Sequence, residues 1–284
     1  MEGYNYDAEA RTNKIEDITS DKINRNILRR LKENDPNFQK LRVTNYRNVE
    51  YDYCAKGARD LGWLGYYIGN NTSLKELCLV LNPFENCNNN AIESFCRGVN
   101  CNRSIQKIRF DSLDPFGGEL FQSLSPLLVN NNSTSELFVC HCLFGAGCAR
   151  QLLLRRATMD LCTLNLFNSN VDDECVDALV DALLSSFSLD LGQNRNITAR
   201  GWRRLAEMLE NPNSNLERLN LMSNNIGDEG ARGFANALAK NCKLKELDLY
   251  DNGITAEGWS CFSETLCDTT SINNTFLSNH TLEN

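Results

Sequence analysis

The chain has 284 residues, 42% of them apolar, and a formal net charge of −8. An acidic balance with scattered Lys and Arg argues against nucleic-acid binding, which needs clustered cations to displace counterions. The mean hydropathy is −0.41, and no apolar run is long enough to cross a bilayer, so we expect no membrane segment.

The N-terminal region divides into a tail and a helix. Residues 1–19 are polar and aperiodic and lack the apolar core of a secretory signal, which predicts a disordered tail. Residues 20–37 contain Ile23, Ile27 and Leu31 on one helical face, behind Ser20 as the N-cap. This spacing predicts an N-terminal helix that caps the core that follows.

From residue 38 onward one sequence motif, called the phrase below, recurs about every 28 residues, a period typical of repeat proteins. Its clearest copies run from Leu216 to Ile226 and from Leu244 to Ile254, and both fit L-x-x-L-x-L-x-x-N-x-I. Weaker copies are Phe38/Leu41/Val43, Leu74/Leu77/Leu79, Ile105/Ile108/Phe110, Leu137/Val139, Leu161/Leu164/Leu166 and Leu189/Leu191, with a truncated last copy at Ile272–Leu277.

The phrase predicts a short strand, then a turn, then a helix. Its L-x-L core alternates with period two, as a strand does when one face is buried. We expect parallel strands near 76–80, 107–111, 137–141, 163–167, 188–192, 218–222 and 246–250. The Asn position must bind backbone groups where the chain leaves the strand, and Cys142 and Ser169 occupy that position in two copies.

A glycine falls four residues after the Ile position in the best copies, as at Gly201, Gly230 and Gly258. Because glycine has no side chain, it lets the first helical turn approach a neighbouring backbone closely. Apolar residues then recur at three- and four-residue spacing, as the buried face of a helix requires.

These units resemble the long, helix-bearing leucine-rich repeats of the ribonuclease-inhibitor type, which also occur in the Ran GTPase-activating protein and in NOD-like receptors. The resemblance covers about residues 38–280. It implies an α/β horseshoe solenoid, spanning 38–284 with a truncated terminal repeat, in which a parallel sheet lines the concave side and helices the convex side.

The remaining chemistry favours a non-catalytic protein without a cofactor. Cys140-His141-Cys142 with Cys148 is the strongest metal-like cluster, but zinc sites need a second ligand pair, and Cys142 already fits the turn position. The chain has 2 histidines and no phosphate-binding glycine loop. We therefore expect no metal, no catalytic residues and no small-molecule substrate.

The 13 cysteines are an odd number without framework-like clustering. In the absence of an export signal, they predict free thiols in a reducing compartment, hence a cytoplasmic protein. Asn-x-Ser/Thr triplets such as Asn71–Ser73 are then expected to arise by chance in an Asn-rich sequence and to stay unmodified.

The residues between the buried leucines should lie on the concave face of the sheet. This register places Phe138, Phe167, Met222 and Tyr250 there and predicts that the three aromatic side chains are substantially exposed. Side chains of this kind anchor protein interfaces. Single exposed aromatic residues are common, but a shared face favours an interface. Acidic residues gather late on this face, namely Asp190, Glu246, Asp248 and Asp251.

The sequence thus predicts a module that binds a protein partner of unknown identity on its concave sheet. One alternative is a regulator of an enzyme, such as a small-GTPase-activating protein. Another is the substrate-receptor subunit of a ubiquitin ligase. Both alternatives rest on fold analogy, because many functions share this repeat type.

Overall fold

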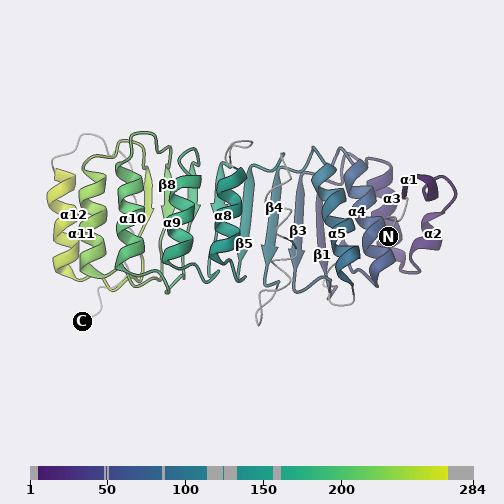
Figure 1. Cartoon of the computed structure of the whole chain (residues 1–284), viewed down its shortest axis with the longest axis horizontal. Helices are drawn as coiled ribbons and strands as arrows, with labels where there is room; N and C mark the ends of the chain where they lie inside the picture. Colours follow the sequence, from purple (N-terminus) through teal and green to yellow (C-terminus); the bar gives the residue numbers. More distant parts are fainter. Residues whose placement is uncertain are drawn as a thin grey trace. The chain divides into compact units, whose positions relative to one another are not determined.

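A computed structural model of the chain describes residues 6–47, 49, 51–84, 87–113, 124, 133–155 and 161–267 (Figure 1). The chain forms two compact units, Met1–Thr134 and Ser135–Asn284, called unit 1 and unit 2 below. Each is built from strand–helix repeats, as the spacing of the apolar residues predicts.

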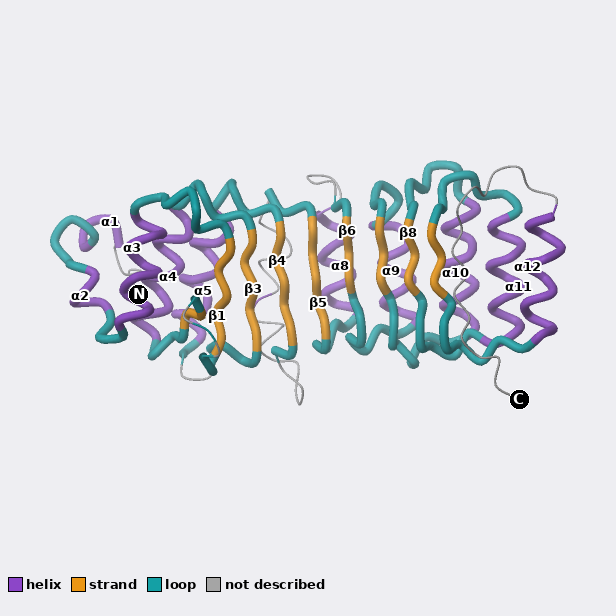
Figure 2. The backbone as a smooth tube through the Cα atoms, turned by 180° about the vertical axis from the view of Figure 1, so that it is seen from behind, coloured by secondary structure: helices purple, strands orange, loops and turns teal. Residues whose placement is uncertain are grey.

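Unit 1 contains a parallel sheet with strand order β2-β1-β3-β4. Helices cover one face of the sheet and leave the other face open (Figure 2). The strands are β1 (Lys40–Thr44), β2 (Asp52–Tyr53), β3 (Glu76–Val80) and β4 (Lys107–Asp111). The helices are α3 (Lys22–Lys32), α4 (Ala58–Asn70) and α5 (Asn89–Cys101), with the short α1 (Tyr6–Glu9) and α2 (Ile15–Ile18) before them.

Unit 2 repeats this arrangement with strand order β5-β6-β7-β8-β9, again all parallel. The strands are β5 (Glu136–Cys140), β6 (Thr163–Asn165), β7 (Ser188–Asp190), β8 (Arg218–Asn220) and β9 (Glu246–Asp248). The helices are α8 (Ala146–Arg155), α9 (Asp173–Ala182), α10 (Ala199–Glu210), α11 (Gly227–Leu238) and α12 (Ala256–Cys267). The predicted α/β solenoid with parallel strands is confirmed.

The repeated leucines form the core between sheet and helices. Leu164, Leu189, Leu219 and Leu247 lie side by side in the strand register, and all are buried. The next apolar position of each repeat, such as Leu221, is buried as well. Each of the strands β6 to β9 therefore turns one face to the core and leaves the intervening side chains on the open face.

The strands of unit 2 after β5 are shorter than predicted, and side-chain capping explains why. In β6 to β9 the side chain of the last strand residue accepts a hydrogen bond from the backbone N–H two residues later. The donor–acceptor pairs are Phe167–Asn165 at 3.0 Å, Gly192–Asp190 at 2.9 Å, Met222–Asn220 at 3.0 Å and Tyr250–Asp248 at 2.9 Å. Each bond occupies an N–H that a longer strand would donate to its neighbour, so the regular strand stops after three residues. Backbone bonds between repeats resume beyond it, as from the Asn168 N–H to the Gly192 carbonyl at 2.8 Å. The equivalent residues Arg42, Cys78, Arg109 and Phe138 lack such an acceptor, and their strands have five residues.

The Asn position forms the predicted turn ladder. The Asn224 side-chain amide donates to the carbonyls of Leu191 (3.0 Å) and Leu221 (2.8 Å), and its oxygen accepts from the N–H of Asn194 (2.7 Å). Asn224 N–H in turn donates to Asn252 Oδ1 at 3.1 Å. Ser169 serves in the same place, since its hydroxyl donates to the Val139 carbonyl at 2.6 Å. The ladder role assigned to this position is confirmed.

A second asparagine ladder, which we did not predict, lies at the other end of the strands. Asn71, Asn102 and Asn241 each donate to the carbonyl of a residue in the preceding repeat, at 2.9, 2.7 and 2.6 Å. Each also accepts the N–H groups two and three residues later. Asn71 and Asn102 belong to Asn-x-Ser triplets, and their buried amides are engaged in these bonds.

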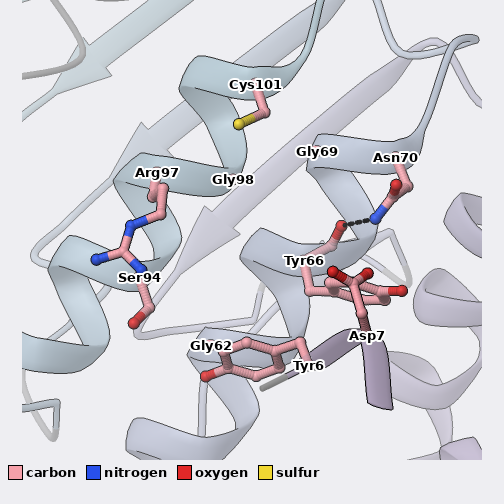
Figure 3. A pocket seen from close by; sticks show the side chains of 10 residues that line it. All are labelled: Tyr6, Asp7, Gly62, Tyr66, Gly69, Asn70, Ser94, Arg97, Gly98 and Cys101. Carbon is pink, nitrogen blue, oxygen red and sulfur yellow. Dashed lines mark hydrogen bonds between the residues drawn. The ribbon is translucent and has the colours of Figure 1, made fainter. Parts of the chain in front are cut away.

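The N-terminal region differs from the prediction in two respects. Residues 6–9 and 15–18 are helical rather than disordered, because Ile15 and Ile18 are buried and Tyr6 packs its ring on Trp63, with centroids 5.1 Å apart. Figure 3 shows Tyr6 beside Gly62, where any side chain would overlap the Tyr6 ring.

The capping helix forms, but Asp21 rather than Ser20 is its N-cap. The Asp21 side chain accepts the N–H groups of Ile23 and Asn24, both at 3.0 Å. Of Ser20 and Asp21, Asp21 is the residue whose side chain accepts the free N–H groups of the first helical turn. The predicted truncated strand at Ile272–Leu277 lies outside the described residues.

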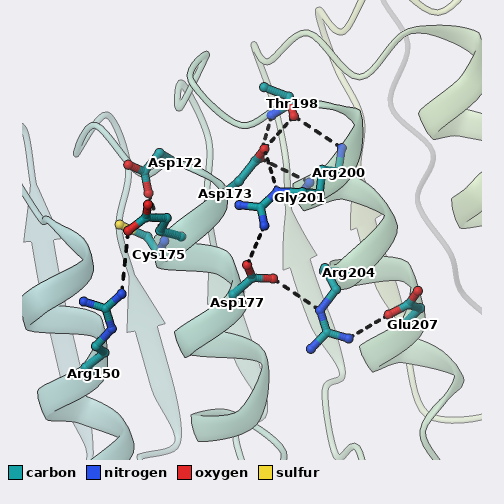
Figure 4. Close-up of polar contacts among 11 residues, drawn as sticks. Arg150, Asp172, Asp173, Cys175, Asp177, Thr198, Arg200, Gly201, Arg204 and Glu207 are labelled. Atoms are coloured by element: carbon teal, nitrogen blue, oxygen red, sulfur yellow. Dashed lines mark hydrogen bonds and ion pairs between the residues drawn. The ribbon is translucent and has the colours of Figure 1, made fainter.

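Two of the recurring glycines, Gly201 (Figure 4) and Gly258, meet a carboxylate of the preceding helix. Asp173, in the first turn of α9, accepts bonds from the Thr198 N–H (2.8 Å), the Thr198 hydroxyl (2.6 Å) and the Gly201 N–H (3.2 Å). A Cβ at Gly201 would overlap this carboxylate, and the same holds for Gly258 beside Asp228. The glycine therefore lets one helix cap the next. Gly230 differs, since a Cβ there would meet the Ile226 side chain instead of a carboxylate.

Candidate functional site

The open face of the sheet in unit 2 carries a shallow groove, which we call the sheet-face groove. It has a volume of about 590 Å³. Side chains that alternate with the core leucines of β5 to β9 line it. They are Phe138, Thr163, Asn165, Ser188, Asp190, Arg218, Asn220, Glu246 and Asp248.

A row of amide and carboxylate side chains runs across this groove from strand to strand. Asn165 donates its side-chain N–H to Asp190 Oδ2 at 2.8 Å, and Asn220 donates to Asp190 from the other side. The thiol of Cys140 donates to Asn165 Oδ1 at 3.3 Å. Since each of these Asn and Asp residues also caps its own strand, the row holds the acidic groups in fixed positions.

Burial raises the pKa of Asp190 above its ordinary value, and the carboxylate of Asp248 raises it further. The hydrogen bonds from Gly192, Asn220 and Asn165 act in the opposite direction. The net upward shift means that the groove disfavours the negative charge on Asp190. A cation that reached Asp190 would therefore relieve an electrostatic cost.

An apolar row lies beside the polar one. A Cβ at Gly192 would come within 2.9 Å of the Phe167 ring and 3.0 Å of Met222 Cγ, so these two side chains meet over the glycine. His141 packs against Phe167 edge to face, with centroids 5.6 Å apart. Tyr250 lies beside the Met222 turn in the next repeat, where its carbonyl accepts the Ser223 N–H at 2.7 Å.

The structure thus brings most of the predicted site residues together, with one correction. Phe138, Asp190 and Asp248 line the groove, and Phe167 and Met222 form the apolar row. The aromatic residues are half-buried rather than substantially exposed, because neighbouring side chains on the same face cover part of their surface. Asp251 is exposed and lies in the turn after β9, outside the groove lining.

Sequence reasoning missed three groove residues, Thr163, Ser188 and Arg218. Each immediately precedes a core leucine and so shares the open face with the residue after that leucine. The period-two pattern could have identified them, but the prediction of the open face rested mainly on the first and third residues after this leucine.

Comparison with known proteins gives the repeat type. The family model described as "Leucine Rich repeat" matches residues 213–235 and 240–263. Each match contains a strand of unit 2 and most of the helix that follows. The chain is a leucine-rich-repeat protein.

Curated relatives with similar repeats are NACHT, LRR and PYD domains-containing proteins. Number 14 of Mus musculus is 32% identical over 128 residues, which is 45% of this chain and 12% of that protein. Number 14 of Homo sapiens is 28% identical over 233 residues, 75% of this chain and 21% of that protein. The chain therefore spans about a fifth or less of the length of these relatives.

Among solved structures, the TLR13–ssRNA13 complex aligns with 75% of this chain and 34% of that chain. The identity is 17% and the TM-score is 0.44. In the part of the chain that the structure describes, no helix is long and apolar enough to cross a membrane.

In these leucine-rich repeats the Cys140–Cys142 cluster has structural contacts. Cys142 donates its thiol to the Cys140 carbonyl at 3.2 Å, and His141 Nδ1 contacts the Asn168 amide at 2.9 Å. Among the described residues, no group of three or more His, Cys, Asp or Glu side chains could hold a metal ion. Several thiols serve as buried apolar groups, and burial raises the pKa of Cys96 and Cys175 to about 12.

The net charge of the leucine-rich-repeat chain is concentrated in unit 2. Counted on the sequence, residues 1–134 contain 17 Lys and Arg against 17 Asp and Glu, whereas residues 135–284 contain 12 against 20. Unit 1 is therefore neutral, and the whole net charge of −8 belongs to unit 2. A basic partner would be attracted to unit 2 over long range.

Proposed function

We propose that the chain is a non-catalytic cytoplasmic module that binds a protein partner on the open sheet face of unit 2, the side predicted to be concave. It needs no cofactor. The observation that supports this proposal is that an apolar row and fixed acidic groups lie together on the sheet face opposite the helices. Interfaces combine such anchors with charges that steer association.

The partner that fits this face is a protein with a basic patch around an apolar side chain. Carboxylates of Asp190, Glu246 and Asp248 outnumber the one cation, Arg218, in the groove lining. Phe167, Met222 and Tyr250 offer apolar contact area beside them. A shallow groove spread over five strands suits an extended protein surface better than an enclosed small molecule.

The test uses affinity capture followed by mass spectrometry, with wild-type chain and two sets of variants. The first set shortens the apolar row with Phe167→Ala and Tyr250→Ala. The second removes charge but keeps a capping oxygen, with Asp248→Asn and Asp251→Asn. The matched control neutralises two exposed carboxylates on the helices, Glu174→Gln and Glu229→Gln.

We expect one protein to be captured by the wild type and the control and to be lost with the apolar variants. With that protein purified, the charge variant should bind more slowly and with a weaker dependence on salt, because charges at an interface rim act mainly on association rate. Equal capture by all variants would show that the open sheet face of unit 2 is not the docking surface.

A further inference from the structure

The first repeat of unit 1 is longer than the others. Its strands β1 and β3 begin 36 residues apart, at Lys40 and Glu76, whereas the other strand starts within each unit are 25 to 31 residues apart. The extra residues form the segment 45–53, which ends in β2 at the edge of the sheet. Insertions in solenoid repeats become surface loops and often carry binding function.

This inserted loop holds large apolar side chains in solvent. Tyr46, Val49 and Tyr51 are 66%, 51% and 62% exposed. Among the described residues they are half of the exposed large hydrophobic side chains, the others being Leu81, Leu143 and Phe187. Three such residues within one short loop form a patch, whereas single exposed apolar residues are ordinary.

Polar anchors fix the loop in place. Arg47 donates from its two terminal nitrogens to both oxygens of Asp21, at 2.9 and 3.2 Å, and to Asn24 Oδ1 at 2.9 Å. Its Nε–H donates to the Asp52 carbonyl at 3.2 Å. These bonds tie Arg47, the neighbour of Tyr46, to the N-terminus of α3 and so restrict the loop at this point before any partner arrives. Preorganisation of this kind lowers the entropy lost on binding.

A cavity of about 690 Å³ opens beside the loop. Its lining includes Val49 and Tyr51 of the loop and the segment 36–40, which contains Phe38 and Lys40. The guanidinium of Arg30 lies over the Phe38 ring, 4.5 Å from its centroid.

The charged groups that line the cavity are mainly cations. Arg30, Lys40 and Arg42 face a single carboxylate, Asp52, whose side chain is 1% exposed and pairs with Arg42 at 3.1 Å. Arg30 and Lys40 pair with Asp35 (2.6 Å) and Glu76 (2.9 Å) outside the lining. A guanidinium carries five N–H donors and an ammonium three, so these ion pairs leave capacity for a second carboxylate.

We propose that this loop and cavity dock an acidic protein segment with a large apolar side chain. The apolar side chain enters between Tyr51, Val49 and Phe38, and the flanking carboxylates meet Lys40, Arg42 and Arg30. A small anion would leave Tyr46 and Tyr51 in solvent, so the exposed patch points to a polypeptide. This surface belongs to unit 1 and does not depend on the function proposed for unit 2.

The test measures fluorescence anisotropy of labelled peptides with the full chain. Three peptides of equal length carry a pair of leucines among glutamates, among glutamines or among lysines. We expect the glutamate peptide to bind about ten-fold more tightly than either of the others, with an affinity that falls as salt rises. The double variant Tyr46→Ser/Tyr51→Ser should weaken that binding about ten-fold, as loss of aromatic anchors does.

Two controls keep the result interpretable. Phe187→Ser removes an aromatic side chain that is 44% exposed in unit 2 and should leave peptide binding unchanged. Thermal unfolding should be the same for the tyrosine variant and the wild type, since both tyrosines are exposed.

A further variant, Lys40→Gln, tests the contribution of charge and should reduce the preference for the glutamate peptide.

Equal binding of the three peptides, or wild-type binding by the tyrosine variant, would overturn the proposal. Sedimentation of the wild type and the tyrosine variant tests whether a second copy of the chain occupies this surface instead. If the wild type is a dimer, the tyrosine variant a monomer and no peptide binds, the surface joins two copies of the chain and the acidic-segment assignment is wrong.

Discussion

Replacing Asn224 by alanine should destabilise unit 2 strongly, although the substitution removes no apolar contact of note. The buried Asn224 side chain makes two donor bonds to the carbonyls of Leu191 and Leu221 and accepts one from Asn194 N–H. Alanine removes all three bonds and leaves the Asn194 N–H without its acceptor, whereas the Leu191 and Leu221 carbonyls each keep one bond, from the side chains of Asn194 (3.0 Å) and Asn252 (2.9 Å). At about 1 kcal/mol for each lost hydrogen bond, the expected loss is about 3 kcal/mol of unfolding free energy.

The matched control is the neighbour Asn225→Ala, whose side chain is exposed and should change stability by less than about 0.5 kcal/mol. Urea unfolding followed by circular dichroism measures both. Hydrogen exchange of amides in β7 and β8 should show that protection is lost there first, because repeats unfold through their neighbours. Equal urea midpoints for the two variants would refute the ladder as a source of stability.

Four further outcomes are expected. Leu219→Ala should cost about 2–5 kcal/mol in urea unfolding, since Leu219 is 2% exposed in the core. Gly201→Ala should destabilise, because its Cβ meets a carboxylate, whereas Gly233→Ala, in open space within α11, should be neutral or stabilising in the same assay. In a carboxyl NMR titration, Asp190 should show a pKa above its ordinary value of 3.8, and Asp248→Asn should lower the pKa of Asp190. Because the pKa of Asp190 is raised in the folded state, ionisation of Asp190 should reduce the free energy of unfolding as the pH rises through that pKa. Alkylation without reductant should modify all 13 cysteines, as the mass of the denatured chain would show.

The repeat, its strands and its core could be predicted because they follow from one local rule. L-x-L places alternate side chains on one face, and the spacing of the phrase sets the neighbour of each strand. Strand register followed as well, since Leu189, Leu219 and Leu247 occupy equivalent positions in the phrase and pair in the sheet.

Features that depend on contacts between repeats were harder to predict. The repeat motif alone does not show that Asn165 or Asp190 caps its own strand, so the predicted strands end two residues too late. The Asn71 ladder had a readable signal, an Asn three residues before the first apolar residue of the phrase, but its meaning depends on a carbonyl 40 residues earlier, at Leu31. The packing of Tyr6 on Trp63 had no local signal at all.

The acidic residues of the open face in unit 2 divide into two kinds once their contacts are known. Asp190 accepts bonds from Gly192, Asn165 and Asn220, so it braces the sheet and is half-buried. Glu246 and Asp251 are exposed. An exposed charge acts on a partner through its long-range field. A carboxylate that already accepts three hydrogen bonds can pair with a cation only after it loses further solvent and one of its donors. Glu246 and Asp251 should therefore govern how fast a basic partner arrives, and Asp190 should govern how well the face keeps its shape when the partner is bound.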